Sequence, residues 1–177
     1  MHWAERIADE IIRKKPDKEQ YVCAAGISPS GSIHIGNFRD IATALFVCKA
    51  LIKKGKKAKL LFSWDEFDRF RKVPKNVQDV DPEGKFEAYI GQPYTSVPNP
   101  FDTEHANYAK YFEAEFMEQM ERFGIEMDYR YQTEMYTSGK YKDDVIEAIS
   151  TRKENFDILD SFRTQDAEEG EQLFFNC

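Results

Sequence analysis

Two short segments hold the residues that could do chemistry, and each of them follows an apolar run. The first, residues 26–37, has the sequence Gly-Ile-Ser-Pro-Ser-Gly-Ser-Ile-His-Ile-Gly-Asn. Its glycines let a backbone approach a ligand closely, because glycine has no Cβ. His34 and Asn37 are three residues apart, so on a helix they would project from the same side. Such a pair could donate hydrogen bonds to one polyphosphate.

The second segment is strongly charged and runs from residue 64 to residue 74, Trp-Asp-Glu-Phe-Asp-Arg-Phe-Arg-Lys-Val-Pro. It directly follows an apolar run at residues 59–64, which is typical of a buried strand. If they bind no ligand, the acids Asp65 and Asp68 would form an exposed cluster of ion pairs with the neighbouring bases Arg69, Arg71 and Lys72.

The elements around both segments predict an α/β fold with a parallel sheet. The apolar patterns predict strands at 21–25, 59–64 and 126–131, and helices at 3–15, 34–54, 102–123, 141–152 and 156–162. Helices between apolar strands indicate right-handed crossovers. Ligands of such sheets bind beyond the carboxyl ends of the strands. That rule points to the loops at 26–37 and 64–72.

Composition narrows the class of protein further. The chain has 177 residues and a net charge of −7, which disfavours a generic DNA- or membrane-coating protein. No apolar run approaches the roughly 20 residues that span a bilayer, and no secretory signal is evident. The three cysteines lie far apart, which fits a reduced cytoplasmic chain, and no Cys-x-x-Cys pair indicates a metal site.

The first segment has an alternative interpretation without a ligand. It matches neither the Gly-x-x-x-x-Gly-Lys phosphate loop nor the Gly-x-Gly-x-x-Gly fingerprint. A sharp turn from strand to helix, with His34 as a polar cap, would explain the same residues. Six lysines between residues 49 and 59 could likewise meet RNA phosphates, but a solvated helix end is the simpler explanation.

The segments also resemble a known family. His-Ile-Gly-Asn at 34–37, after Gly-Ile-Ser-Pro-Ser-Gly at 26–31, resembles the HIGH signature of class I aminoacyl-tRNA synthetases. Residues 37–40 and 64–74 resemble the class I lysyl-tRNA synthetases in particular, and so do His-Trp-Ala at 2–4 and Ile-Ala-Asp at 7–9. The likeness covers most of residues 1–162.

The resemblance implies a Rossmann-like catalytic domain that activates lysine with ATP and transfers it to tRNA. His34 and Asn37 would be the catalytic residues, stabilising charge at the α-phosphate. The residues implied in ATP binding are Pro29, Ser30, Gly31, His34, Gly36 and Asn37. Mg²⁺ would accompany the ATP, held largely by phosphate oxygens and water.

The resemblance also implies a lysine site. Gly26 and Ser28 would contact the amino acid at the strand end. Asp40 is the candidate for the charged contact with lysine, and Asp65 and Asp68 are the alternatives. Two residues depart from the family pattern: Ser28 stands where threonine is usual, and Asp40 where glutamate is usual. Serine keeps the hydroxyl group, whereas aspartate shortens the reach by one methylene.

The expected organisation is that of an incomplete catalytic domain. We predict a first Rossmann half at 1–72, a proline-rich loop or insertion at 73–101, a helix–strand–helix part at 102–162 and an acidic tail at 163–177 that begins an inserted connective region. No KMSKS-like segment is present, so we expect an N-terminal fragment that is inactive alone. Zinc would be bound only in a longer parent chain, through Cys177.

Two other functions remain open on the sequence: a nucleotidyltransferase with another substrate, and a synthetase-like ATP-binding protein without catalysis. Lysine and tRNA are the expected partners, and no membrane is expected. An unpaired sheet edge would also permit self-association or a complementing fragment.

Overall fold

A computed structural model describes residues 2–102 and 104–163 of the chain. The chain divides into two compact units, residues 1–133 and 134–177, and the first of them holds the sheet. In the part of the chain that the structure describes, no helix is long and apolar enough to cross a membrane. Both segments singled out in the sequence belong to the first unit.

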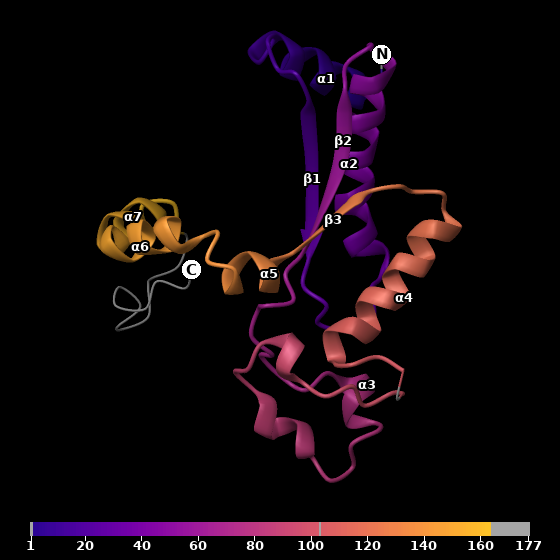
Figure 1. Ribbon diagram of the computed structural model, residues 1–177, viewed down its shortest axis with the longest axis vertical. Helices are drawn as coiled ribbons and strands as arrows, with labels where there is room; N and C mark the ends of the chain where they lie inside the picture. Colours follow the sequence, from indigo (N-terminus) through magenta and orange to yellow (C-terminus); the bar gives the residue numbers. More distant parts are fainter. Residues whose placement is uncertain (1, 103, 164–177) are drawn as a thin grey trace. The chain divides into compact units, whose positions relative to one another are not determined.

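The sheet of the first unit has three parallel strands, which confirms the predicted α/β class (Figure 1). They are β1 (Tyr21–Ile27), β2 (Ala58–Trp64) and β3 (Asp128–Tyr131), in the order β1-β2-β3. The register pairs Ile27 with Trp64, and Trp64 with Tyr131. All three strands therefore end at the same level, and the loops that follow them leave from one edge of the sheet.

Two helices form the crossovers between the strands. Helix α2 (Ile35–Lys53) connects β1 to β2, and α4 (Tyr108–Arg122) lies between β2 and β3 in the chain. Aromatic side chains join α4 to the sheet, because the Phe62 and Phe116 rings stack with centroids 4.9 Å apart. Both side chains are almost fully buried, so this contact forms the centre of the main core.

Helix α1 (Trp3–Lys14) packs on α2 at the amino ends of β1 and β2, whereas the short helix α3 (Lys75–Gln78) lies beyond their carboxyl ends (Figure 1). A histidine begins α1: Nδ1 of His2 accepts the N–H of Ala4 at 3.3 Å, and the Glu5 carboxylate accepts the N–H of His2 at 3.3 Å. This reciprocal pair of bonds is a capping box.

Several predicted boundaries are wrong, and for two of them the contacts show the reason. Strand β1 does not stop at Gly26 but continues to Ile27, because Gly26 pairs with Ser63 in the ladder. The helix predicted from residue 102 begins at Tyr108, where the Asn107 side chain accepts the N–H of Lys110 at 3.0 Å. Asp102 instead accepts the N–H of His105 at 3.0 Å and so closes a turn before the helix.

The proline-rich segment at 73–101 contains local structure and a core of its own. It contains α3 and two 3₁₀ helices, Lys85–Tyr89 and Tyr94–Ser96. Its buried side chains pack with the start of α4 and form a second apolar cluster of Phe70, Val77, Tyr94, Val97, Tyr108, Ala109 and Phe112. This cluster fixes the loop after β2, which contains Phe70.

The second unit contains helices α6 (Lys142–Ser150) and α7 (Arg152–Asp160), and α5 (Gln132–Thr137) spans the division between the units. The sequence predicts both α6 and α7, although α7 begins four residues before the predicted start. The acidic tail predicted at 163–177 and Cys177 lie outside the described residues, apart from Arg163.

Candidate functional site

His34 caps the start of α2 with one of its ring nitrogens. Nδ1 accepts the N–H of Gly36 at 3.1 Å, while Oδ1 of Asn37 accepts the N–H of His34 at 3.2 Å. Since Nδ1 is the acceptor, the neutral ring has its proton on Nε2. Nε2 and the Asn37 amide nitrogen remain as donors at the positive end of the helix dipole. His34 is therefore a polar cap of α2, and the cap leaves a donor pair available for an anion.

At two of the glycines near this turn, other parts of the protein occupy the space that a side chain would need. A Cβ at Gly36 would lie 2.8 Å from Cε1 of His34, so the glycine allows the ring to fold back on the helix. A Cβ at Gly26 would lie 2.8 Å from the carbonyl oxygen of Ser63 on β2. Gly31, by contrast, has nothing within 4 Å of the corresponding position. Of these three glycines, only Gly31 has open space beside it.

The structure brings the two predicted loops together at the carboxyl ends of β1 and β2. The Ser28 hydroxyl donates to Oδ2 of Asp68 at 2.7 Å. At the ends of the two strands, the N–H of Asp65 donates to the carbonyl oxygen of Ile27 at 3.0 Å. These two bonds join segments about 40 residues apart in the sequence, at the edge where ligands of parallel sheets bind.

Asp65 occupies a partly desolvated position in this meeting point. Burial is the main cause that raises the pKa of its carboxyl group, and the nearby charge of Asp68 adds to it. The Ser63 hydroxyl, which donates to Oδ1 at 3.3 Å, acts in the opposite direction. A carboxylate whose charge is so poorly solvated gains most from a bound cation.

Asp40 lies apart from this group. Its side chain is exposed on α2, and in residues 2–102 and 104–163 no hydrogen bond or ion pair links it to Ser28, Asp65 or Asp68. The structure thus gathers three of the acids and hydroxyls expected to bind lysine and leaves the fourth on a helix surface.

Glu66 is a buried acid that the sequence patterns did not single out. Its two carboxylate oxygens accept the backbone N–H groups of Gln132 at 3.1 Å and Thr133 at 3.0 Å. The Gln132 side chain donates in turn to the Ser63 hydroxyl at 2.6 Å. Glu66 therefore fastens the start of α5, directly after β3, to the end of β2. An acid next to Asp65, directly after a buried strand, is the signal that could have indicated it.

Tyr108 supports the first loop through its phenol. The hydroxyl donates to the carbonyl oxygen of Ser30 at 3.0 Å, although the side chain is otherwise fully buried in the second apolar cluster. The helical spacing of Tyr108, Phe112 and Phe116 predicts that these rings are core, and the structure confirms it. The phenol bond to the loop could have been expected only from the general need of a buried tyrosine for a partner.

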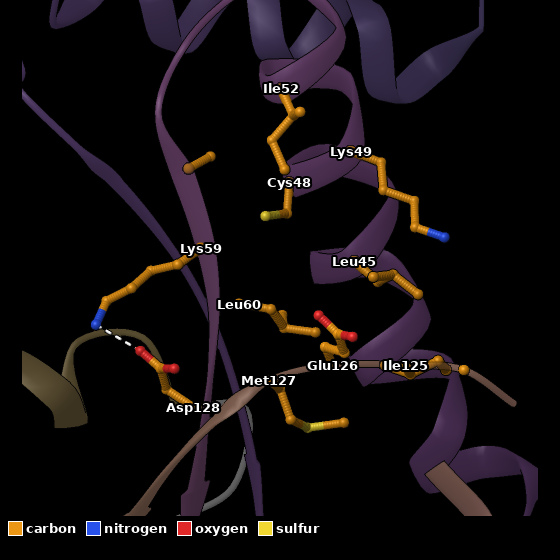
Figure 2. A pocket seen from close by; sticks show the side chains of 12 residues that line it. Leu45, Cys48, Lys49, Ile52, Lys59, Leu60, Ile125, Glu126, Met127 and Asp128 are labelled. Carbon is orange, nitrogen blue, oxygen red and sulfur yellow. Dashed lines mark hydrogen bonds and ion pairs between the residues drawn. The ribbon is translucent and has the colours of Figure 1, made fainter. Parts of the chain in front are cut away.

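Cavities lie at both ends of the sheet. One, of about 310 Å³, lies beside the Ser28–Asp68 bond and includes Ser30 and Tyr94 in its wall. Another, of about 430 Å³, lies between α2, the start of β2 and the segment before β3, with the Lys59–Asp128 ion pair at 2.6 Å in its wall (Figure 2). A further cavity, of about 590 Å³, lies between α4 and the segment before β3. The cavities of about 430 and 590 Å³ contain none of the expected site residues and lie away from the carboxyl ends of β1 and β2. The cavity of about 310 Å³ is therefore the candidate site.

The expected Mg²⁺ finds no cage of protein ligands in this region. Within residues 2–102 and 104–163 no group of three or more histidine, cysteine, aspartate or glutamate side chains is arranged to hold a metal ion. Magnesium keeps several waters and is often bound through substrate phosphates.

Comparison with known proteins identifies a family. The family described as "tRNA synthetases class I (K)" matches residues 1–176. The lysine–tRNA ligase of Pyrococcus horikoshii is 42% identical over 163 residues, and that of Thermococcus kodakarensis is 44% identical over 163 residues; each alignment covers 92% of this chain. The lysine–tRNA ligase of Streptomyces coelicolor is 40% identical over 169 residues, covering 93% of the chain. The chain spans about 30% of the length of these curated relatives.

Proposed function

Because this chain belongs to the lysine type of class I tRNA synthetases, we propose that it acts in lysine–tRNA ligation, with formation of lysyl-adenylate from ATP and transfer of lysine to tRNA. The observation that carries the proposal is the meeting of the two loops at the aligned ends of β1 and β2, beside the capped start of α2. Protein synthesis takes place in the cytoplasm, so the proposed activity implies that location.

The start of α2 would bind the phosphates of ATP. Nε2 of His34 and the amide nitrogen of Asn37 would donate to the α-phosphate, and the helix dipole favours negative charge at that end. The turn at 29–31 would accommodate the rest of the nucleotide, and Gly36 would contribute by allowing the His34 ring to fold back on the helix. One well-placed donor of this kind contributes roughly 2.7–4 kcal/mol to a transition state. Mg²⁺, bound to the phosphates, would neutralise part of their charge.

The lysine substrate would lie at the ends of β1 and β2. Gly26 and Ser28 would contact its α-amino end, and Asp65 would bind the ε-ammonium group, because its carboxylate is partly desolvated. The substrate carboxylate would then attack the α-phosphorus, form a new O–P bond and release pyrophosphate. A hydroxyl of the terminal adenosine of tRNA would next attack the carbonyl carbon, and AMP would leave.

The test is the affinity for ATP of His34→Asn, measured by calorimetry on the full chain. Asparagine is a favourable N-cap residue, so this variant keeps the helix cap while it removes Nε2. We expect the affinity for ATP to fall by about tenfold or more, because one hydrogen bond to a charged group is removed. The melting temperature should change little.

The chain offers a matched control in His2→Asn. His2 caps α1 through the same ring nitrogen as His34 caps α2, and its reciprocal partner is Glu5, at the position that corresponds to Asn37. We expect His2→Asn to bind ATP as the unchanged protein does. If both variants bind ATP with the affinity of the unchanged protein, the assignment of His34 is wrong. If both bind ATP more weakly than the unchanged protein and to the same extent, the effect is one of stability.

A further inference from the structure

Three basic residues after β2 lie around one buried aromatic side chain. Phe70 is fully buried, and its ring packs against Tyr94 and Tyr108 with centroids 5.9 and 5.5 Å away. The backbone of Phe70 donates to the carbonyl oxygen of Gln92 at 2.7 Å and accepts the N–H of Gly91 at 2.8 Å. Next to it, Arg69 forms an antiparallel bridge with Pro93. The segment is thus held extended against residues 91–94.

The direction of the basic side chains follows from this extended backbone. Successive side chains of an extended chain point to opposite faces. Since Phe70 points into the second apolar cluster, Arg69 and Arg71 point away from it. Both are exposed, and both line the 310 Å³ cavity together with Lys72. The buried ring therefore places the two arginine side chains on the same side of the segment, where both line the cavity.

The charges in this cavity are not balanced. Three cations and one carboxylate, that of Asp68, line it, and Asp68 already accepts the Ser28 hydroxyl. Among the described residues no ion pair includes Arg69, Arg71 or Lys72. The lysine-rich region at 49–59 differs, because three of its ammonium groups have carboxylate partners: Lys53 with Glu5, Lys54 with Asp9 and Lys59 with Asp128.

We infer that this cavity is a phosphate-binding site, separate from the donors of His34 and Asn37. Arginine binds phosphate through paired N–H donors, and two arginines from one rigid segment can hold one phosphate ester. The same wall contains Ser30 and Tyr94, whose side chains are hydrogen-bonded to each other. The proposed function enters only in naming the molecule that carries the phosphate. That molecule is either an RNA strand, through its backbone, or ATP, through its polyphosphate.

The experiment compares Arg71→Gln and Arg69→Gln with the unchanged full chain in binding two probes, ATP and a short single-stranded RNA. Binding is measured by calorimetry for ATP and by fluorescence anisotropy at several salt concentrations for RNA. We expect each variant to bind one probe about tenfold more weakly. If that probe is RNA, the slope of log affinity against log salt should also become shallower, by about 0.7 for each phosphate that the variant no longer neutralises.

Arg122→Gln is the matched control, because Arg122 is an exposed arginine in the last turn of α4 and does not line the cavity. It removes the same charge and should leave both affinities unchanged. Weaker RNA binding with unchanged ATP binding identifies RNA as the source, and the reverse identifies ATP. The inference is overturned if Arg69→Gln and Arg71→Gln bind both probes as Arg122→Gln does.

The same measurements separate this site from the proposed function. If His34→Asn leaves ATP binding intact while Arg71→Gln weakens RNA binding, the assignment of the cavity as a phosphate site is supported. The assignment of the ATP site at the start of α2 is then wrong. Should the histidine variant lose ATP while both arginine variants behave normally, only the cavity is rejected. Thermal melting of each variant checks that the fold is kept, which we expect because both arginines are exposed.

Discussion

At the scale of single residues, the two ring nitrogens of His34 have different roles. Nδ1 stabilises the start of α2 and Nε2 remains a donor. The spacing of His34 and Asn37 predicts their common side from sequence alone, because residues three apart on a helix are neighbours. The use of Nδ1 for the cap could not be predicted, since it depends on the extended backbone of His34, with φ −121° and ψ 174°.

Asp65 and Asp40 can be distinguished by lysine binding. We expect lysine to raise the melting temperature more than leucine does when ATP is present, and Asp65→Asn to abolish this difference. A ligand at 100 times its Kd stabilises a protein by about 2.7 kcal/mol, which is measurable by thermal melting. Asp40→Asn is the control, because Asp40 lies on an exposed helix face. If only Asp40→Asn abolishes the difference, the ammonium group is bound at α2 instead.

At the scale of elements, the contact between β1 and β2 depends on the absence of one side-chain atom. Gly26→Ala places a Cβ 2.8 Å from the Ser63 carbonyl oxygen, which belongs to the backbone and cannot rotate away. We expect the free energy of unfolding to fall by about 2 kcal/mol, a typical cost of overpacking. Chemical denaturation of the purified variant measures it.

Gly31→Ala is the control for this change, because nothing lies within 4 Å of its added Cβ. It should not lower the free energy of unfolding, since a surface substitution of this kind usually changes stability by less than about 0.5 kcal/mol. Equal stability of the two variants would mean that the strands can separate at Gly26 without cost.

The elements with strong periodicity were predictable, and those held by distant contacts were not. The apolar runs and the helical stripe of residues 34–54 predict β1, α2 and β2, and the rule for parallel sheets predicts that the two loops meet. Asp102 and Asn107 are both good N-cap residues, however. The helix begins at the second because the N–H of Tyr108 donates to the carbonyl oxygen of Val97 at 2.9 Å, a contact with no local signal.

At the scale of the whole molecule, charges in the interior make stability depend on pH. Glu66 and Glu113 are the buried charged residues among those described. Oε2 of Glu113 accepts from Lys110 at 2.6 Å, but Oε1 is buried and has no hydrogen-bond partner. Burial, reinforced by Glu66, raises the pKa of Glu113, although Lys110 acts in the opposite direction.

The sign of the pH dependence follows from this raised pKa. Between its ordinary pKa and the raised one, Glu113 holds its proton more tightly in the folded state, so stability decreases as the pH rises through that window. We expect Glu113→Gln to remove this decrease. Its melting temperature relative to the unchanged protein should therefore increase from acidic to neutral pH.

Glu118→Gln is the control on the same helix, because Glu118 is exposed. The difference in melting temperature between this variant and the unchanged protein should stay constant with pH. A constant difference for Glu113→Gln as well would show that the ion pair with Lys110 balances the effect of burial.

The twin histidine caps give the molecule an internal reference for spectroscopy. In both His2 and His34 the Nδ1 lone pair faces a backbone amide, so the two imidazoles should show the same tautomer in nitrogen-15 NMR spectra. Titration with nucleotide would then perturb the resonances of one ring while the other serves as the unperturbed standard in the same tube.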